Sequence, residues 1–156
     1  NFHISNLFKK NDDVFINING LLLKRDQAKI SVFDSGFLLG DGVWESIRLL
    51  NGRMVFLDEH LNRLYDGAEK LSMHIGKKPG ELIELIQKTL DVNSMETDVH
   101  IRLIISRGLK KTPYQHPNAN IGNSTIVIIP EFKESDKNKI NSNGKWYYQQ
   151  KLLRTK

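Results

Sequence analysis

Hydrophobic and polar residues alternate with a period of two over several short stretches in the first half of the chain. Such alternation is typical of β-strands that bury one face. The stretches "VFINING" and "LLLKR", residues 14–20 and 21–25, predict a β-hairpin, because Asn19-Gly20 supplies the positive φ angles of a two-residue turn. The stretch "AKISVFD", residues 28–34, predicts a further short β segment.

The same signals recur further along the chain. Residues 43–50, "VWESIRLL", and residues 53–57, "RMVFL", predict a second hairpin that turns at Asn51-Gly52. Residues 99–108, "VHIRLIISRG", are more strongly apolar, which favours a central strand.

From Asp58 the apolar period changes to three and four residues, which indicates an amphipathic helix. The apolar positions of this helix are Leu57, Leu61, Leu64, Ala68 and Leu71. Asp58 is the expected N-cap. A second helix is expected after Pro79-Gly80, and its apolar face consists of Leu82, Ile83, Leu85, Ile86 and Leu90.

These elements predict the α+β class, with a small N-terminal domain in which two helices pack on an antiparallel sheet. Residues 124–130, "STIVIIP", are the expected last strand, so the domain is expected to span residues 1–130. The polar and charged residues 131–144 are typical of an interdomain linker. Residues 145–156 are the expected first strand of a second, truncated domain.

Composition narrows the possible functions. The chain has 156 residues and no cysteine, which excludes disulfides, thiolate zinc sites and cysteine nucleophiles. No apolar run approaches the roughly 20 residues of a membrane span, and the first residues lack the order of a signal peptide, so a cytoplasmic protein is expected. The net charge is +5, but the basic residues are interspersed with acids and lack interleaved aromatics, which argues against nucleic-acid binding.

Arg63 is the first candidate functional residue. A helix arginine is commonly a solvated surface charge. Arg63, however, borders the apolar stripe of its helix, with His60 three residues before it and Gly67 four residues after it. These three residues together suit a phosphate group: Arg63 offers a planar set of hydrogen-bond donors, His60 offers an imidazole beside it, and Gly67 leaves the helix surface without a side chain.

The strand "HIRLIISRG" supplies the second group of candidates. With a period of two, His100, Arg102 and Ile104 share one face, and the intervening residues form the core. An arginine in a cavity on such a strand favours a carboxylate partner. Trp44 is either core or a pocket wall, and the following loop "LKKTPYQHP", residues 109–117, is either a lid or a connector. The histidines are too scattered to predict a metal site.

The stretch "FDSGFLLGDGVWESIRLLNGRMVFLDEHLNRLYDGAEKL", followed by "HIRLIISRG", resembles the N-terminal domain of class IV, or fold-type IV, aminotransferases. The resemblance covers residues 14–130 and implies pyridoxal 5'-phosphate as cofactor and a homodimer that acts on amino acids and 2-keto acids. It implies that Arg63, the arginine of the H-x-x-R-L helix, binds the cofactor phosphate. The residues that it implies for substrate binding are Leu39, Trp44, His100, Arg102 and Tyr114.

The resemblance also indicates a substrate class. By the branched-chain pattern, Arg102 meets the side-chain carboxylate of glutamate or 2-oxoglutarate, while Trp44 and Leu39 flank an apolar side chain. The D-amino-acid enzymes carry an arginine and a histidine where this chain has Thr112 and Tyr114, which disfavours D-specificity. The "SRG" ending of the strand is also similar to aminodeoxychorismate lyase, so a lyase on the same fold remains an alternative.

The lysine that forms the covalent link to the cofactor has no counterpart here and is expected beyond Lys156. The chain is therefore expected to contain no catalytic residue of its own and to be inactive alone. A third alternative is a dimerisation or binding domain without catalytic activity.

Overall fold

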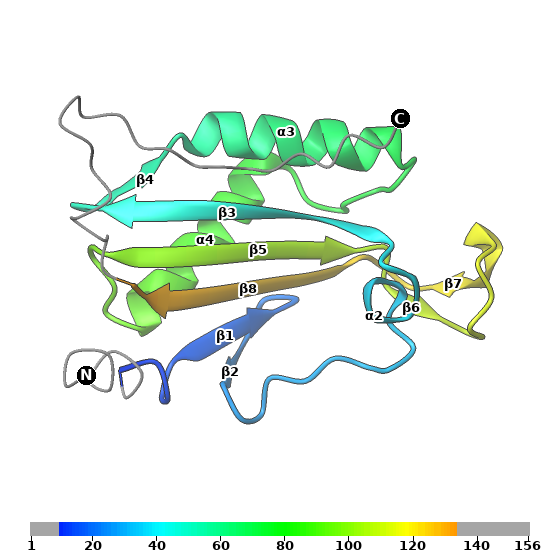
Figure 1. The fold of residues 1–156 in the computed structure, drawn as a ribbon, viewed down its shortest axis with the longest axis horizontal. Coiled ribbons are helices and arrows are strands. Elements are labelled where there is room, and N and C mark those ends of the chain that lie inside the picture. Colours follow the sequence, from blue (N-terminus) through cyan, green and yellow to red (C-terminus); the bar gives the residue numbers. More distant parts are fainter. Residues whose placement is uncertain (1–9, 134–156) are drawn as a thin grey trace, which may run out of the picture.

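The computed structural model describes residues 10–133. Their main feature is a six-stranded antiparallel sheet in the order β2-β1-β8-β5-β3-β4 (Figure 1). Its strands are β1 (Phe15–Ile18), β2 (Leu21–Lys24), β3 (Gly42–Leu50), β4 (Arg53–Val55), β5 (Val99–Ser106) and β8 (Thr125–Phe132). A two-stranded sheet comprises β6 (Leu109–Lys110) and β7 (Asn120–Ile121). The expected α+β class is confirmed.

Two long helices cover one face of the sheet, which we call the helix face. They are α3 (Leu57–Lys70) and α4 (Pro79–Val92), and α4 passes behind the strands in Figure 1. Fully buried side chains from both helices and from alternate positions of β3, β5 and β8 form the core. The opposite side, turned toward the viewer in Figure 1, is called the front face.

Both predicted hairpins are confirmed. Asn19 and Gly20 join β1 to β2 with φ angles of 54° and 90°. Asn51 and Gly52 join β3 to β4 with φ angles of 49° and 73°. These left-handed angles are tolerated by asparagine and glycine, which is why the dipeptide marked both turns in the sequence.

Helix α3 begins at Leu57, two residues before the start expected from Asp58 as its N-cap. Its N-cap is Phe56, whose backbone is left-handed and whose side chain makes no capping hydrogen bond, so the prediction of Asp58 as N-cap is wrong. Asp58 instead lies in the first helical turn, where its charge complements the helix dipole. Leu71 lies beyond the helix and is 45% exposed, so it is not part of the buried stripe.

The β segment predicted at residues 28–34 is also wrong, because these residues contribute only an isolated bridge between Asp34 and Leu109. Asp34 instead caps the short helix α2 (Ser35–Leu39) by accepting a hydrogen bond from Gly36. Its second carboxylate oxygen accepts from Ser106 at the end of β5. The conformation of residues 28–34 therefore depends on the capping of α2 and on a long-range hydrogen bond. The alternation of apolar and polar residues alone led to the wrong prediction of a strand.

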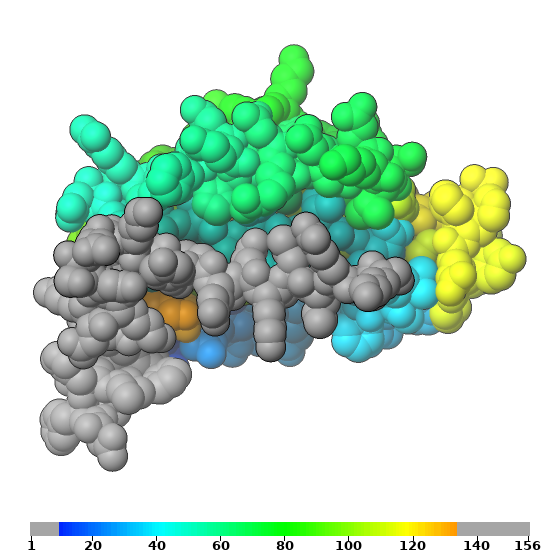
Figure 2. Space-filling model, turned by 45° about the horizontal axis from the view of Figure 1, so that its top comes forward, coloured from blue at the N-terminus to red at the C-terminus, as the bar shows by residue number. Residues whose placement is uncertain are grey.

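The loop after β5 folds into an arm that projects from one end of the sheet beside α2 (Figure 2). It contains β6, a 3₁₀ turn (Pro117–Ala119) and β7, and buried Lys110 donates to Asn120 within it. Strand β8 continues to Phe132, two residues into the stretch with linker composition. The rest of that stretch and the strand expected at residues 145–156 lie outside the described residues.

Candidate active site

Arg63 forms the centre of a charged cluster with Glu45 of β3. Its Nε donates to Oε1 of Glu45 at 2.7 Å, and its Nη2 donates to Oε2 at 2.6 Å. Nδ1 of His60 lies 2.7 Å from the same Oε2 and 3.1 Å from Nη2 of Arg63. The expected proximity of His60 to Arg63 is therefore confirmed, and a carboxylate joins them.

Glu45 lies where it can fix the orientation of Arg63. Alternation on β3 places Glu45 on the helix face together with Ile47, and its side chain is only 6% exposed. Strand β4 pairs only with Arg48–Leu50 of β3, so α3 covers the earlier part of the edge of β3. A buried carboxylate needs a charged or hydrogen-bonding partner, and the two side chains from α3 supply it.

The ionisation of Glu45 reflects these contacts. Burial by itself raises the pKa of Glu45, but the hydrogen bonds from Arg63 and His60 and their charges outweigh it, so the net shift of the pKa is downward. The hydrogen bond to Glu45 in turn raises the pKa of Arg63. Both groups are therefore charged at neutral pH.

The Arg63 guanidinium keeps donors for a ligand. Glu45 occupies Nε and Nη2, whereas Nη1 has no hydrogen-bond partner within residues 10–133. The side chain is 61% exposed, so this edge faces outward from the described part of the chain. The Arg63 guanidinium is thus held by a carboxylate through Nε and Nη2, while Nη1 can donate to a ligand. Such an arrangement suits the recognition of an anion.

The structure does not test the expected role of Gly67 beside a phosphate group. A Cβ added there would lie 3.4 Å from Cγ1 of Val43 on β3, which is an ordinary contact. Helix α3 thus approaches β3 at this point, and the described residues do not require a glycine for it.

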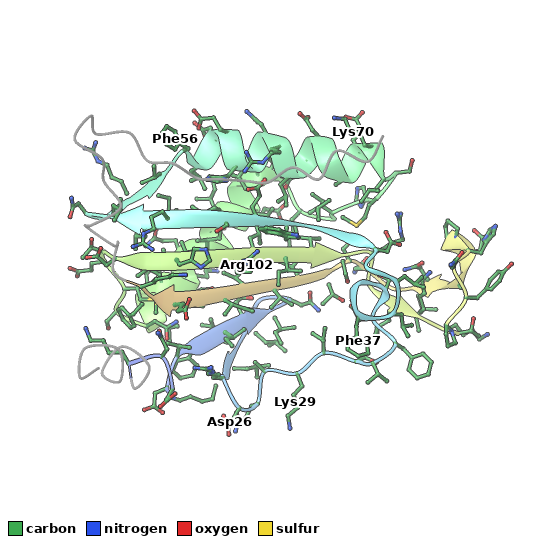
Figure 3. All side chains as sticks on the ribbon, in the orientation of Figure 1. Asp26, Lys29, Phe37, Phe56, Lys70 and Arg102 are labelled. Atoms are coloured by element: carbon green, nitrogen blue, oxygen red, sulfur yellow. The ribbon has the colours of Figure 1, made fainter. Side chains whose placement is uncertain are left out.

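On the front face, two side chains of β5 lean onto two side chains of β3. The register pairs Ser46 with Arg102 and Arg48 with His100. Each β5 residue contacts the diagonal neighbour instead, so Arg102 lies over the Trp44 ring at 4.2 Å and His100 bonds to Ser46. Figure 3 shows Arg102 over the middle of the sheet, on the side opposite α4. The expected common face of His100 and Arg102 is confirmed.

Trp44 is not a core residue, because its side chain is 55% exposed and its ring carries the Arg102 guanidinium. A cation–π contact of this kind contributes about 0.5–1 kcal/mol at an exposed site. Consecutive residues Trp44 and Glu45 point to opposite faces of β3, so the Arg63 cluster and the Arg102 pair lie on either side of the same strand.

Leu39 and Tyr114 lie apart from these two clusters in the fold. Leu39 ends α2, and Tyr114 belongs to the projecting arm between β6 and β7. Helix α2 and the arm lie at the end of the sheet where β5 continues into β6 (Figures 1 and 2), and both residues are exposed. The structure does not test their expected substrate contacts.

Two polar residues of the site were missed in the sequence. Glu45 and Ser46 lie within "VWESIRLL", where the period of two could have shown an acid on the apolar face. An acidic residue on the apolar face of a strand needs a cationic partner, so the position of Glu45 in the pattern could have indicated a buried ion pair. The partner itself could not be inferred from spacing, because Arg63 lies 18 residues further along the chain.

A second ion pair ties the glycine turn before β3 to α3. Arg107 donates from Nε and Nη2 to the two carboxylate oxygens of Asp41, at 2.7 and 3.1 Å. Its Nη1 and Nη2 also donate to the backbone carbonyls of Ser72 and Leu71 after α3. One guanidinium thus joins the entry of β3, the end of β5 and the end of α3.

Arg107→Ala is expected to lower the free energy of unfolding of the chain by about 1–3 kcal/mol, the usual range for losing hydrogen bonds to a charged group. Arg107→Lys should fall between Arg107→Ala and the wild type, because an ammonium group cannot make all four bonds at once. Urea unfolding followed by circular dichroism measures both. A loss below about 0.5 kcal/mol in Arg107→Ala, the size of an ordinary surface effect, would contradict this role.

Within the described residues, no group of histidine and acidic side chains is arranged to hold a metal ion. None of the helices described there is long and apolar enough to cross a membrane.

Comparison with known proteins agrees with the fold. The sequence profile of the family described as "Amino-transferase class IV" matches residues 42–152. The "Branched-chain-amino-acid aminotransferase-like protein 1" of Arabidopsis thaliana is 40% identical over 112 residues, which cover 72% of this chain and 20% of that protein. A "D-alanine aminotransferase" of Staphylococcus aureus is 33% identical over 115 residues, which cover 74% of this chain and 40% of that protein.

A solved structure has the same fold. A branched-chain amino acid aminotransferase from T.th., complexed with N-(5'-phosphopyridoxyl)-L-glutamate, is 26% identical and superimposes with a TM-score of 0.65. The match covers 76% of this chain and 40% of that one. The chain therefore spans between 20% and 40% of the length of the three proteins compared.

Proposed function

Because this chain belongs to the class IV aminotransferase family, we propose that it is part of a pyridoxal-phosphate-dependent aminotransferase. The reaction is the transfer of an amino group between an L-amino acid, branched-chain or other, and a 2-keto acid such as 2-oxoglutarate. The observation that carries the proposal is the Arg63 guanidinium, which Glu45 holds on one edge while the other edge is open. The activity is proposed for the complete protein, whose cofactor-linked lysine we expect beyond Lys156.

The residues present fit the phosphate of pyridoxal phosphate. The phosphate is a dianion, and the outward donors of Arg63 provide a charge and two N–H groups for it. Glu45 balances the charge of Arg63, but the open edge of the guanidinium still presents N–H donors, and His60 lies beside the pair as a further polar group. Pyridoxal phosphate, when bound, supplies the electron sink for proton transfer at the substrate Cα.

The task of this chain in the reaction is binding and orientation. Arg63 holds the phosphate and thereby sets the position of the cofactor. Arg102, stacked on Trp44, presents its fork to a substrate carboxylate, and the Trp44 ring offers an apolar wall. His100 lies beside Arg102 as a further polar contact. Leu39 and Tyr114 complete the proposed substrate contacts from α2 and the arm.

We propose a cytoplasmic homodimer as the working form, a proposal that the family resemblance supports. Large apolar side chains are exposed on α2 and on the arm, among them Phe37, Tyr114 and Ile121. A surface of this kind is typical of a protein contact.

The test is an amino-transfer assay on the complete protein with 2-oxoglutarate and either L-leucine or D-alanine. We expect glutamate to form from L-leucine and at least tenfold more slowly from D-alanine, a difference of about 1.4 kcal/mol in the barrier. Release of pyruvate from aminodeoxychorismate without a keto acid would instead indicate the lyase. A protein that binds pyridoxal phosphate but performs neither reaction would contradict both activities.

A further inference from the structure

We propose that Asp34 is a positioning residue for the substrate pocket. Its carboxylate joins the first turn of α2 to Ser106 at the end of β5, and it thereby fixes the place of Leu39, the proposed contact for the amino-acid side chain. The bond between Asp34 and Ser106 therefore sets how strongly the complete protein prefers a large apolar substrate over a small one. The inference rests on the proposed function, because it needs Leu39 as a substrate contact.

The carboxylate of Asp34 links two elements that are far apart in the sequence. Its Oδ1 accepts a hydrogen bond of 2.8 Å from the N–H of Gly36 in α2, and its Oδ2 accepts one of 2.9 Å from Oγ of Ser106 in β5. Asp34 and Ser106 are only 2% and 4% exposed. A buried carboxylate is costly without hydrogen-bond partners, so the two contacts keep α2 and the end of β5 together.

The first turn of α2 also packs closely on the end of β5. A Cβ added to Gly36 would lie 2.9 Å from Cβ of Ser106, closer than side chains tolerate. The N–H of Ser35 donates to the carbonyl of Gly108 at 2.8 Å, and the N–H of Gly108 donates to Oγ of Ser106 at 3.1 Å. The Ser106 hydroxyl thus lies where α2, β5 and the start of the arm meet.

The direction of α2 depends on these contacts at its first turn. The helix has five residues, and so short a helix is not stable in water by itself. It ends at Gly40, and the chain then returns to the first turn, where the N–H of Asp41 donates to the carbonyl of Ser35 at 3.3 Å. Leu39, the last residue of α2, is 38% exposed at the end of the sheet from which the arm projects (Figure 1). A shift of the first turn therefore moves Leu39.

Three variants of the complete protein separate the long-range bond from the helix cap. Asp34→Asn keeps both contacts, because its amide oxygen can accept from Gly36 and its amide nitrogen can donate to Ser106. Asp34→Ser keeps an oxygen for the cap but has no second oxygen for Ser106. Ser106→Ala removes the long-range donor and leaves the cap in place.

The first readout is kcat/KM for L-leucine divided by kcat/KM for L-alanine, with 2-oxoglutarate as the acceptor. We expect Ser106→Ala and Asp34→Ser to lower this ratio about three- to tenfold, and Asp34→Asn to stay within about twofold of the wild type, because a displaced pocket wall loses apolar contact with leucine. An unchanged ratio in Ser106→Ala or in Asp34→Ser, or an equal fall in Asp34→Asn, would overturn the inference. If one variant does not fold, the other decides.

A double-mutant cycle tests whether the effect passes through Leu39. Leu39→Ala should lower the same ratio, and adding Ser106→Ala to it should lower the ratio no further, because residues that act through one contact are not additive. Falls that multiply in the double variant would overturn the inference, since Ser106 would then act elsewhere. An unchanged ratio in Leu39→Ala would overturn it as well.

A readout that needs no activity separates the inference from the proposed function. In ¹³C spectra of the complete protein with labelled leucine methyl groups, Leu39→Ala identifies the Leu39 signals. These should shift in Ser106→Ala and Asp34→Ser and stay in place in Asp34→Asn, while the signals of Leu21 on the β1–β2 hairpin stay in place in all three. Unshifted Leu39 signals in Ser106→Ala, or equal shifts of Leu21, would overturn the inference. If the complete protein transfers no amino group, the proposed function fails, and these spectra alone decide whether Asp34 fixes Leu39.

Discussion

Arg63→Ala is expected to weaken the binding of pyridoxal phosphate to the complete protein by about ten- to a hundredfold. A hydrogen-bonded contact to a charged group contributes about 1.5–3 kcal/mol, and each 1.4 kcal/mol is a factor of ten in affinity. Titration followed by the visible absorbance of the cofactor measures this change. Arg63→Lys should restore part of the affinity, because lysine keeps the charge but not the planar fork.

The matched control for this experiment is Arg53→Ala. Arg53 is an exposed arginine of β4, and its removal takes away the same charge without touching the Arg63 cluster. We expect its affinity for the cofactor to stay within a factor of two of the wild type, about 0.4 kcal/mol. If both variants lose affinity equally, the effect is one of net charge, and the assignment of Arg63 to the phosphate is contradicted.

Glu45→Gln is expected to lower the free energy of unfolding of the chain by about 1–3 kcal/mol at pH 7, since two charge-assisted hydrogen bonds are lost. The glutamine amide also brings donors toward Arg63, which has only donors to offer. The same variant should weaken pyridoxal phosphate binding, because the guanidinium loses the carboxylate that fixes its plane. Urea unfolding and cofactor titration measure the two effects.

The contribution of Glu45 depends on pH in a defined direction. The pKa of Glu45 is lower in the folded protein than its ordinary value of 4.5, so folding favours the ionised form. The stabilisation is fully present above that ordinary value and is lost as the pH falls through the lowered pKa of the folded state. The free energy of unfolding of the wild type should therefore fall toward that of Glu45→Gln below about pH 4.5.

Two comparisons test this reasoning. Glu45→Asp keeps a carboxylate on a shorter side chain, so it should retain the pH dependence while losing part of the stability. A difference between wild type and Glu45→Gln that stays constant from pH 7 to pH 3.5 would show that the ionised carboxylate is not its source.

Much of the fold was predictable because it follows from local rules. The two Asn-Gly turns supply left-handed angles whatever surrounds them, and the period of α3 follows from the burial of Leu61 and Leu64. Arg63 and His60 were predictable neighbours because positions three apart meet on any helix.

The rest depends on contacts between distant segments. Residues 28–34 alternate like a strand, but Asp34 meets Ser106, 72 residues away, and caps α2 instead. The contact of Arg102 with Trp44 joins diagonal neighbours on β5 and β3. It depends on the register of the two strands, which neither stretch of sequence reveals by itself.

The most direct test of the assignment of Arg63 is a set of four dissociation constants. Pyridoxal phosphate and pyridoxal, which lacks the phosphate, are each titrated into wild type and Arg63→Ala as complete proteins. Because the covalent link is common to both ligands, the comparison isolates the contact between phosphate and residue. We expect the phosphate to improve affinity at least tenfold more in wild type than in Arg63→Ala, a coupling of about 1.4 kcal/mol. An equal improvement in both proteins would contradict the assignment of Arg63.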